Sequence, residues 1–256
     1  MAGERPARLD LSRPRAYGEL LQTTIEVFRH RADVLLTVAL ILVAPPTLIV
    51  DGIWGRALAE GVDARPELVT QGVSAALSVF VILPLVTAAT ALVVRGLGRA
   101  EAPPTTGEAL RSAALAYPRV VAAVVLYIVG VFAGLVLFIV PGVYLAIRGY
   151  FVAQAVVLDG VGPVQALRAS SDTVQHSWWR TFAYLLATAL IFGIMGSVAI
   201  SLFGATGSGA VYVAGLTVVE SIALSLTSIF ATLLFYDLRA RQGQRPVSDA
   251  PETMAE

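Results

Sequence analysis

The chain has 256 residues, of which 57% are hydrophobic and 14% are charged, and its formal net charge is zero. A soluble domain carries about 25% charged residues, so this composition, with a mean hydropathy of +0.76, excludes an ordinary soluble domain. The absence of cysteine excludes disulfides and thiolate chemistry, and the absence of lysine excludes a phosphate-binding loop of the Walker type.

The two ends of the chain are polar, and the apolar part lies between them. Residues 1–16 and 242–256 are predicted to be disordered and cytoplasmic, and residues 17–241 to form one transmembrane domain. Just before the first apolar run, large apolar residues recur at helical spacing, which predicts an amphipathic helix on the membrane surface. These residues are Tyr17, Leu21, Ile25 and Phe28.

Six apolar segments follow, each of a length suited to a membrane span. We therefore predict an all-α polytopic bundle of six transmembrane helices with additional interfacial helices. Pro141-Gly142 is expected to make the turn between the third and fourth spans. The segments are about 34–50, 73–94, 120–140, 143–158, 182–203 and 210–236.

Arginine placement sets the expected orientation. With the N-terminus in the cytoplasm, the arginines fall almost entirely in cytoplasmic segments; only Arg56 and Arg65 fall in outer segments, and Arg148 lies inside a span. Both termini are then cytoplasmic. Because all basic residues are arginine in a chain rich in alanine, valine and glycine, we expect a bacterial protein in the cytoplasmic membrane.

The stretches before the first, third and fifth spans resemble one another. They read GELLQTTIEVFRHR (18–31), GEALRSAALAYPR (107–119) and VQALRASSDTVQHSWWR (164–180). They suggest three copies of one unit, in which a surface helix precedes a helical hairpin. The alternative is that cytoplasmic amphipathic helices converge on a similar composition.

The third surface helix is the clearest, because Gly162-Pro163 is a favourable helix start. Two tryptophans at its end suit the lipid–water interface, and polar side chains beside them can face water or headgroups. Two roles are consistent with this helix: a plain interfacial anchor, or a specific binding site for an anionic lipid headgroup. The interfacial residues are Arg168, His176, Trp178, Trp179 and Arg180.

Small residues mark two expected packing faces. Gly130 and Gly134, four residues apart in the third span, allow close helix approach in lipid, either within the chain or between copies. Ser221 and Ser225 belong to a hydroxyl stripe on the sixth span. Such a stripe faces other helices or lines a polar pathway.

Two charges lie well inside predicted spans, namely Arg148 and Glu220. A charge at mid-membrane is costly and normally has a partner or a wet cavity, and we estimate that the two residues lie at similar depth. We therefore predict an Arg148–Glu220 pair. The pair could fix helix docking or form a solute, ion or lipid site, and the alternative is that Arg148 extends to the headgroups.

Residues 139–182 resemble the signature of the glycerophosphoryl diester phosphodiesterase membrane-domain family. The segment carries a Pro-Gly turn, a basic residue, Asp159, Gly-Pro, Ala-Leu, Ser and a Trp-rich end, and LLFYDLRAR (233–241) resembles that family's last span. The resemblance implies a membrane fold and not phosphodiesterase activity, because the chain has only two histidines and no room for a catalytic barrel.

These observations lead to two expectations for function. The first is a non-enzymatic integral membrane protein, an accessory or scaffold in membrane organisation. Its expected partners are membrane lipids and a membrane-protein partner or a second copy, with no nucleic acid, cofactor or metal. The second is a small-solute or lipid transporter that uses Arg148 and Glu220 near mid-membrane.

Overall fold

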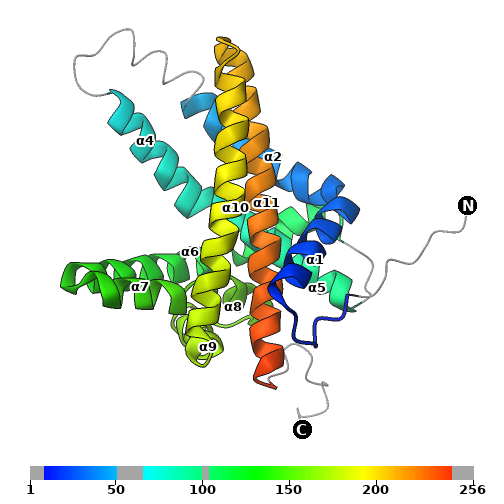
Figure 1. The fold of residues 1–256 in the computed structure, drawn as a ribbon, viewed down its shortest axis with the longest axis vertical. Helices are drawn as coiled ribbons and strands as arrows, with labels where there is room; N and C mark the ends of the chain where they lie inside the picture. Colours follow the sequence, from blue (N-terminus) through cyan, green and yellow to red (C-terminus); the bar gives the residue numbers. More distant parts are fainter. Residues whose placement is uncertain (1–8, 51–65, 100–103, 244–256) are drawn as a thin grey trace, which may run out of the picture.

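The computed structural model describes residues 9–50, 66–99 and 104–243, and it contains helices and no strand in those ranges (Figure 1). The predictions for residues 1–8, for 244–256 and for Arg56 and Arg65 lie outside them. The helices are α1 (Tyr17–His30), α2 (Ala32–Thr47), α4 (Pro66–Leu77), the π-helix η2 (Ser78–Ile82), α5 (Leu83–Arg99), α6 (Thr106–Leu137), α7 (Ile139–Arg148), α8 (Val152–Asp159), α9 (Pro163–Gln175), α10 (Trp178–Gly204) and α11 (Gly209–Arg241).

Six helical stretches of the described chain are long and apolar enough to cross a membrane, which confirms the predicted fold class. Each overlaps one of the six predicted segments. They are Ala32–Val50, Gly72–Arg99, Thr106–Leu137, Ile139–Asp159, Trp178–Gly204 and Gly209–Arg241.

The core surrounds α11. Its residues 229–238 are all buried, whereas most helices bury a single face. It packs against α10, α2, α5 and α1, and it lies near the centre of the molecule in Figure 1. A helix that is apolar and buried all round belongs in the middle of a bundle, so α11 is the element on which the others assemble.

The second span is irregular at Pro84. A proline has no N–H and clashes with the carbonyl four residues earlier, here that of Phe80. The chain forms the π-helix η2 at this point, and the Phe80 carbonyl accepts a hydrogen bond of 3.0 Å from the Tyr117 hydroxyl of α6. A tyrosine from a neighbouring span thus supplies the donor that Pro84 lacks.

Helix α6 differs from its prediction because it is one continuous helix of 32 residues. The sequence predicts a separate surface helix over 107–119. One face of α6 is buried on both sides of Pro118, through Ala109, Ala113, Val120 and Ala123. Continued packing of that face outweighs the single backbone hydrogen bond that Pro118 removes. The three repeated units are not confirmed.

The turn between the third and fourth spans also differs. The chain reverses at Phe138, whose extended backbone (φ −162°, ψ 155°) separates α6 from α7. Pro141 and Gly142 lie in the first turn of α7, where a proline loses no helical hydrogen bond. In Figure 1 the α6–α7 hairpin extends sideways from the long α10–α11 hairpin.

The predicted packing glycines behave differently from each other. A Cβ added to Gly134 would lie 2.9 Å from the Cα of Gly142, so α6 and α7 touch backbone to backbone there. A Cβ on Gly130 would meet nothing within 4 Å. Gly134 is therefore a contact within the chain, and Gly130 faces open space.

The expected disorder of residues 1–16 does not hold for residues 9–16. Leu9 and Leu11 pack against the core, and Arg15 is buried. At the other end, Gln242 donates to the carbonyls of Asp172 and Thr173. Asp237 and Arg241, near the end of α11, bind the backbone of Arg15 in the N-terminal segment. The polar composition of the N-terminal segment does not indicate this interaction.

The surface helices α1 and α9 exist where they were predicted, but α1 buries a different face. Leu20, Thr24 and Val27 are buried against the bundle, whereas Ile25, from the predicted stripe, is 49% exposed. Helix α1 packs against α11 and α2. The inward face is therefore rotated by about one residue from the predicted stripe, of which Tyr17, Leu21 and Phe28 still pack partly buried against the core.

Candidate functional site

The fourth span is broken between α7 and α8, and Ser170 of α9 repairs the break. The Ser170 hydroxyl donates to the Arg148 carbonyl at 2.8 Å and accepts from the Phe151 backbone N–H at 3.1 Å. The Tyr127 hydroxyl of α6 donates to the Ala146 carbonyl at 3.0 Å. Backbone groups freed inside a span must be satisfied by protein, so these two side chains make the break possible.

Arg148 is the last residue of α7, next to this break. Its Nη1 donates to the Tyr144 hydroxyl at 3.0 Å, and its guanidinium lies 5.4 Å from the centre of the Tyr144 ring. Its Nη2 lies 3.5 Å from the Ser171 carbonyl of α9. Its Nε is buried and has no hydrogen-bond partner among the described residues.

The ion pairs that the structure forms between described residues do not include the predicted Arg148–Glu220 pair. The prediction assumed one continuous helix over 143–158. The break after Arg148 instead leaves α7 packed against α6, α9 and α10, and the guanidinium meets α9 rather than α11, which carries Glu220.

A pocket of about 290 Å³ opens beside Arg148, between α6, α7 and α9. Arg168, on the exposed face of α9, stands on the same pocket. Most of the other lining side chains are apolar, so two arginines border an apolar wall. The lining residues are Leu126, Tyr127, Gly130, Val131, Leu145, Arg148, Gly149, Leu167, Arg168 and Ser171.

A buried ion pair lies at the end of α11. Arg239 donates to both carboxylate oxygens of Asp159, at 2.7 and 2.6 Å, and the two side chains are 8% and 3% exposed. The Arg239 guanidinium also lies 4.1 Å from the centre of the Phe235 ring. This bidentate geometry is the strong form of an arginine–carboxylate contact, and it fastens the end of α8 to α11.

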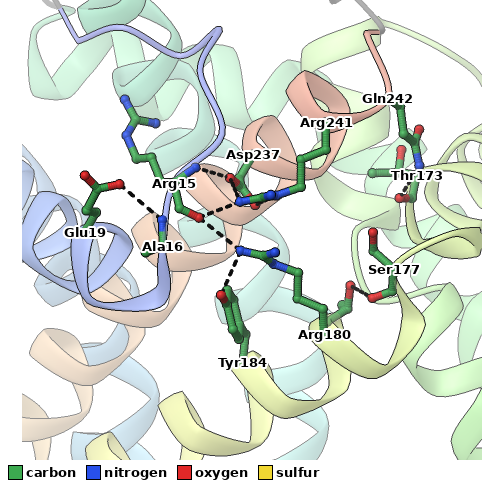
Figure 2. Close-up of polar contacts among 11 residues, drawn as sticks. Arg15, Ala16, Glu19, Thr173, Ser177, Arg180, Tyr184, Asp237, Arg241 and Gln242 are labelled. Atoms are coloured by element: carbon green, nitrogen blue, oxygen red, sulfur yellow. Dashed lines mark hydrogen bonds and ion pairs between the residues drawn. The ribbon is translucent and has the colours of Figure 1, made fainter.

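Figure 2 shows a second cluster, in which the N-terminal segment meets α10 and α11. The Arg15 backbone N–H donates to Asp237, which is fully buried and also pairs with Arg241 at 3.0 Å. The Arg15 carbonyl accepts from Arg241 at 2.8 Å and from Arg180 at 3.2 Å. Burial is the main cause that lowers the pKa of the Arg15 guanidinium below its usual value.

The predicted interfacial residues gather where α9 meets α10. Trp178 stacks on Phe182 and donates from Nε1 to the Tyr144 carbonyl at 3.3 Å, whereas Trp179 is 76% exposed. His176 is exposed. Arg180 turns inward, where it donates to the Tyr184 hydroxyl at 2.8 Å in addition to the Arg15 carbonyl. Arg180 is thus a structural contact and not a headgroup-facing residue.

The serine stripe of α11 faces other helices. Ser221 and Ser225 are fully buried and donate to the carbonyls of Thr217 and Ser221. The Ser225 hydroxyl also lies 3.5 Å from the Leu35 carbonyl of α2. Within the described ranges, no group of three His, Cys, Asp or Glu side chains is placed to hold a metal ion.

Comparison with known proteins identifies a family. Residues 19–240 match the model of a domain of unknown function, DUF7847. The chain belongs to this family. No curated protein and no solved structure matches the chain.

The DUF7847 match covers the pocket beside Arg148 and the Asp159–Arg239 pair. It leaves out Arg15 and Arg241, which join the N-terminal segment to α11. The family domain thus contains both the pocket beside Arg148 and the Asp159–Arg239 ion pair. Nothing in the comparison links the chain to the glycerophosphoryl diester phosphodiesterase membrane-domain family, and that resemblance stays a prediction.

Sequence reasoning missed the buried ion pairs. Asp237 and Arg241 are four residues apart on one helix, a spacing that brings side chains together, and this signal was available. Asp159 and Arg239 are 80 residues apart, and no local pattern joins them. Their pairing depends on how α8 and α11 pack.

Proposed function

We propose that this protein is a non-enzymatic integral membrane protein of the bacterial cytoplasmic membrane that binds anionic lipid headgroups beside Arg148 and Arg168. In this role it serves as an accessory in membrane organisation, with membrane lipids as its partners. The observation that carries the proposal is the pocket between α6, α7 and α9, where these two arginines border an apolar wall.

The chemistry of this pocket suits a lipid phosphate. Arginine binds phosphate through a planar fork of donors, and Arg148 and Arg168 both line this pocket. Leu126, Leu145 and Leu167 offer apolar surface to acyl chains. The exposed Trp179 lies near the start of α10, and tryptophan favours the headgroup level of a membrane.

The orientation of the chain in the membrane is part of the proposal. We place both termini in the cytoplasm, because this orientation puts most of the arginines on the cytoplasmic side. The pocket would then face the inner leaflet, where a positive site attracts anionic lipids. Kinship with the glycerophosphoryl diester phosphodiesterase membrane domains would fit this role.

The transporter alternative has less support. A transporter built on Arg148 and Glu220 needs those side chains together, and Arg148 bonds to Tyr144 and Ser171 instead.

The test is lipid binding by the purified full chain. Native mass spectrometry in detergent counts bound dioleoyl phosphatidylglycerol against dioleoyl phosphatidylcholine. We expect a preference for phosphatidylglycerol, and about a fivefold loss of affinity in Arg168→Gln, since one arginine near anionic lipid contributes about 1 kcal/mol. Arg148→Gln should act in the same direction.

Arg111→Gln is the matched control, because Arg111 is an exposed arginine of α6 outside the pocket. It makes the same change in net charge. If Arg111→Gln reduces phosphatidylglycerol binding as much as Arg168→Gln does, the preference comes from overall charge, and the proposed site is wrong. Equal binding of both lipids by the unmodified protein would also refute it.

A further inference from the structure

A second, larger cavity of about 630 Å³ lies between four of the candidate membrane spans. Its walls come from α4, η2 and α5 of the second span, from α6, from the α7–α8 break with the start of α8, and from α11. The volume is typical of small-molecule sites, and no charged residue lines it. The polar side chains on the wall are a minority; they are Thr87, Tyr127, Tyr150, Gln154, Thr227 and Ser228.

The cavity opens at the second span. Ala75 and Ala76 of α4 line it and are exposed. Phe80 and Leu83 line it as well, and they are 37% and 41% exposed. All four lie within the candidate span Gly72–Arg99, and Figure 1 shows α4 at the outside of the bundle. Because apolar side chains of a span border this mouth, it faces the hydrocarbon of the membrane.

The floor of the cavity is buried in the bundle. Val152, Ala153 and Gln154 of α8 are 2%, 9% and 2% exposed, and Ser228 and Ala231 of α11 are each 3% exposed. The cavity therefore runs from a mouth at the bilayer to a floor that lipid on the outer surface of the bundle does not reach. A chain-shaped apolar molecule can enter such a space from the side.

Two irregular points of the spans border this cavity, and α6 holds each of them. The Tyr117 hydroxyl donates to the Phe80 carbonyl of η2 at 3.0 Å, and the Tyr127 hydroxyl donates to the Ala146 carbonyl before the α7–α8 break at 3.0 Å. The Tyr127 ring also lies against Gly149, where an added Cβ would come within 2.4 Å of its Cδ2. A π-helical turn inside an α-helix is often found at a functional site. These contacts hold the two walls in place without side chains that fill the space between them.

We propose that this cavity holds one acyl chain of a bilayer phospholipid, which enters from the side past η2. An unfilled apolar space deprives its lining atoms of dispersion contacts, and an acyl chain from the bilayer restores them. The uncharged wall offers no counter-charge to a headgroup, so the headgroup stays at the mouth. Water held by the few polar side chains of the wall is the alternative occupant.

The experiment is photolabelling of the full chain in vesicles of dioleoyl phosphatidylcholine. A small fraction of the lipid carries a diazirine at the end of one acyl chain, and mass spectrometry of peptides locates the label after illumination. Lipid around the bundle labels exposed side chains such as Leu190 and Ile194 of α10, which are 53% and 60% exposed. We expect additional label on the buried residues 152–154. Label on exposed surfaces alone would overturn the proposal and favour water or a closed cavity.

Ala76→Trp places a bulky side chain at the mouth. We expect it to reduce labelling of residues 152–154 by about tenfold or more, because one methylene in an apolar pocket already changes binding by about 10–200-fold. Ala189→Trp is the matched control, because Ala189 is an exposed alanine of α10 outside the cavity, and it should leave that label intact. If Ala76→Trp leaves the label unchanged, or Ala189→Trp reduces it equally, the lipid does not enter through this mouth, and the proposal is wrong.

Arg168→Gln separates this site from the proposed headgroup site. Tyr127 lines both pockets, but the larger cavity uses neither Arg148 nor Arg168, so the label on residues 152–154 should not change. Its loss in Arg168→Gln would overturn the independent site. Equal binding of phosphatidylglycerol and phosphatidylcholine would refute the headgroup site and leave this one standing. Because mapping the label on the unmodified protein needs no variant, it decides the matter even if Ala76→Trp fails to fold.

Discussion

Replacing Asp159 by asparagine removes one half of the buried pair at the end of α11. Arg239 then keeps its charge in a site where it is 8% exposed, with no carboxylate at the 2.6 and 2.7 Å contacts. Two unit charges about 4 Å apart interact by about 4 kcal/mol at an effective dielectric constant of about 20. Measured losses from breaking one partner of a buried pair are about 3–5 kcal/mol.

We therefore expect Asp159→Asn to lower the free energy of unfolding by about 3–5 kcal/mol. The cation–π contact of Arg239 with Phe235, at 4.1 Å, remains and places the loss at the lower end. The assay is unfolding of the purified protein by sodium dodecyl sulfate in mixed micelles, followed by circular dichroism. Asp172→Asn changes an exposed acid on α9 that forms no ion pair among the described residues, and it should change stability by less than about 0.5 kcal/mol.

The double variant Asp159→Leu with Arg239→Met tests the cause. It removes both charges, so it should be considerably more stable than Asp159→Asn alone, since a buried pair replaced by apolar residues costs little. If Asp159→Asn loses less than about 1 kcal/mol, or the double variant is no better than the single one, the stranded charge is not the source of the loss, and the reasoning fails.

The remaining two predictions concern the α6–α7 hairpin and the break that follows it. Gly134→Ala should destabilise the protein by about 1–3 kcal/mol in the same assay, because its methyl group would strike a backbone atom. Gly130→Ala should be neutral or slightly stabilising, and an equal loss in both variants would contradict the close contact. Ser170→Ala should cost about 1–3 kcal/mol by stranding the Phe151 N–H. An unchanged unfolding curve would show that the serine does not hold the break.

The fold class follows from the sequence because hydropathy is a local property. A span needs about 20 apolar residues wherever it packs, and the runs that end near Val50, Leu137 and Gly204 are legible without knowing their neighbours. The surface helix α9 was also located correctly, since Gly162-Pro163 starts it as expected. The face of α1 that turns inward was not predicted correctly, because it depends on how α1 packs against α11.

The candidate site was predicted only in part. Arg148 and Arg168 were singled out as polar residues that needed an explanation, yet their common pocket depends on the break after α7. Helix periodicity cannot show a break that is stabilised by Ser170 from a different helix. The partner of a charged residue inside a span likewise depends on tertiary packing. The Arg148–Glu220 pair was predicted from depth along an assumed straight helix, whereas Arg148 contacts Tyr144 and Ser171.

The position of α11 has a consequence for biosynthesis. It is the last described helix in the chain, beginning at Gly209, and it is also the one that α1, α2, α5 and α10 pack around. At about 5–20 residues per second, translation takes about 10–40 s to reach it. During that interval the earlier spans sit in the membrane with their inward faces uncovered. Assembly of this protein is therefore completed late, when its last helix enters and its predecessors close around it.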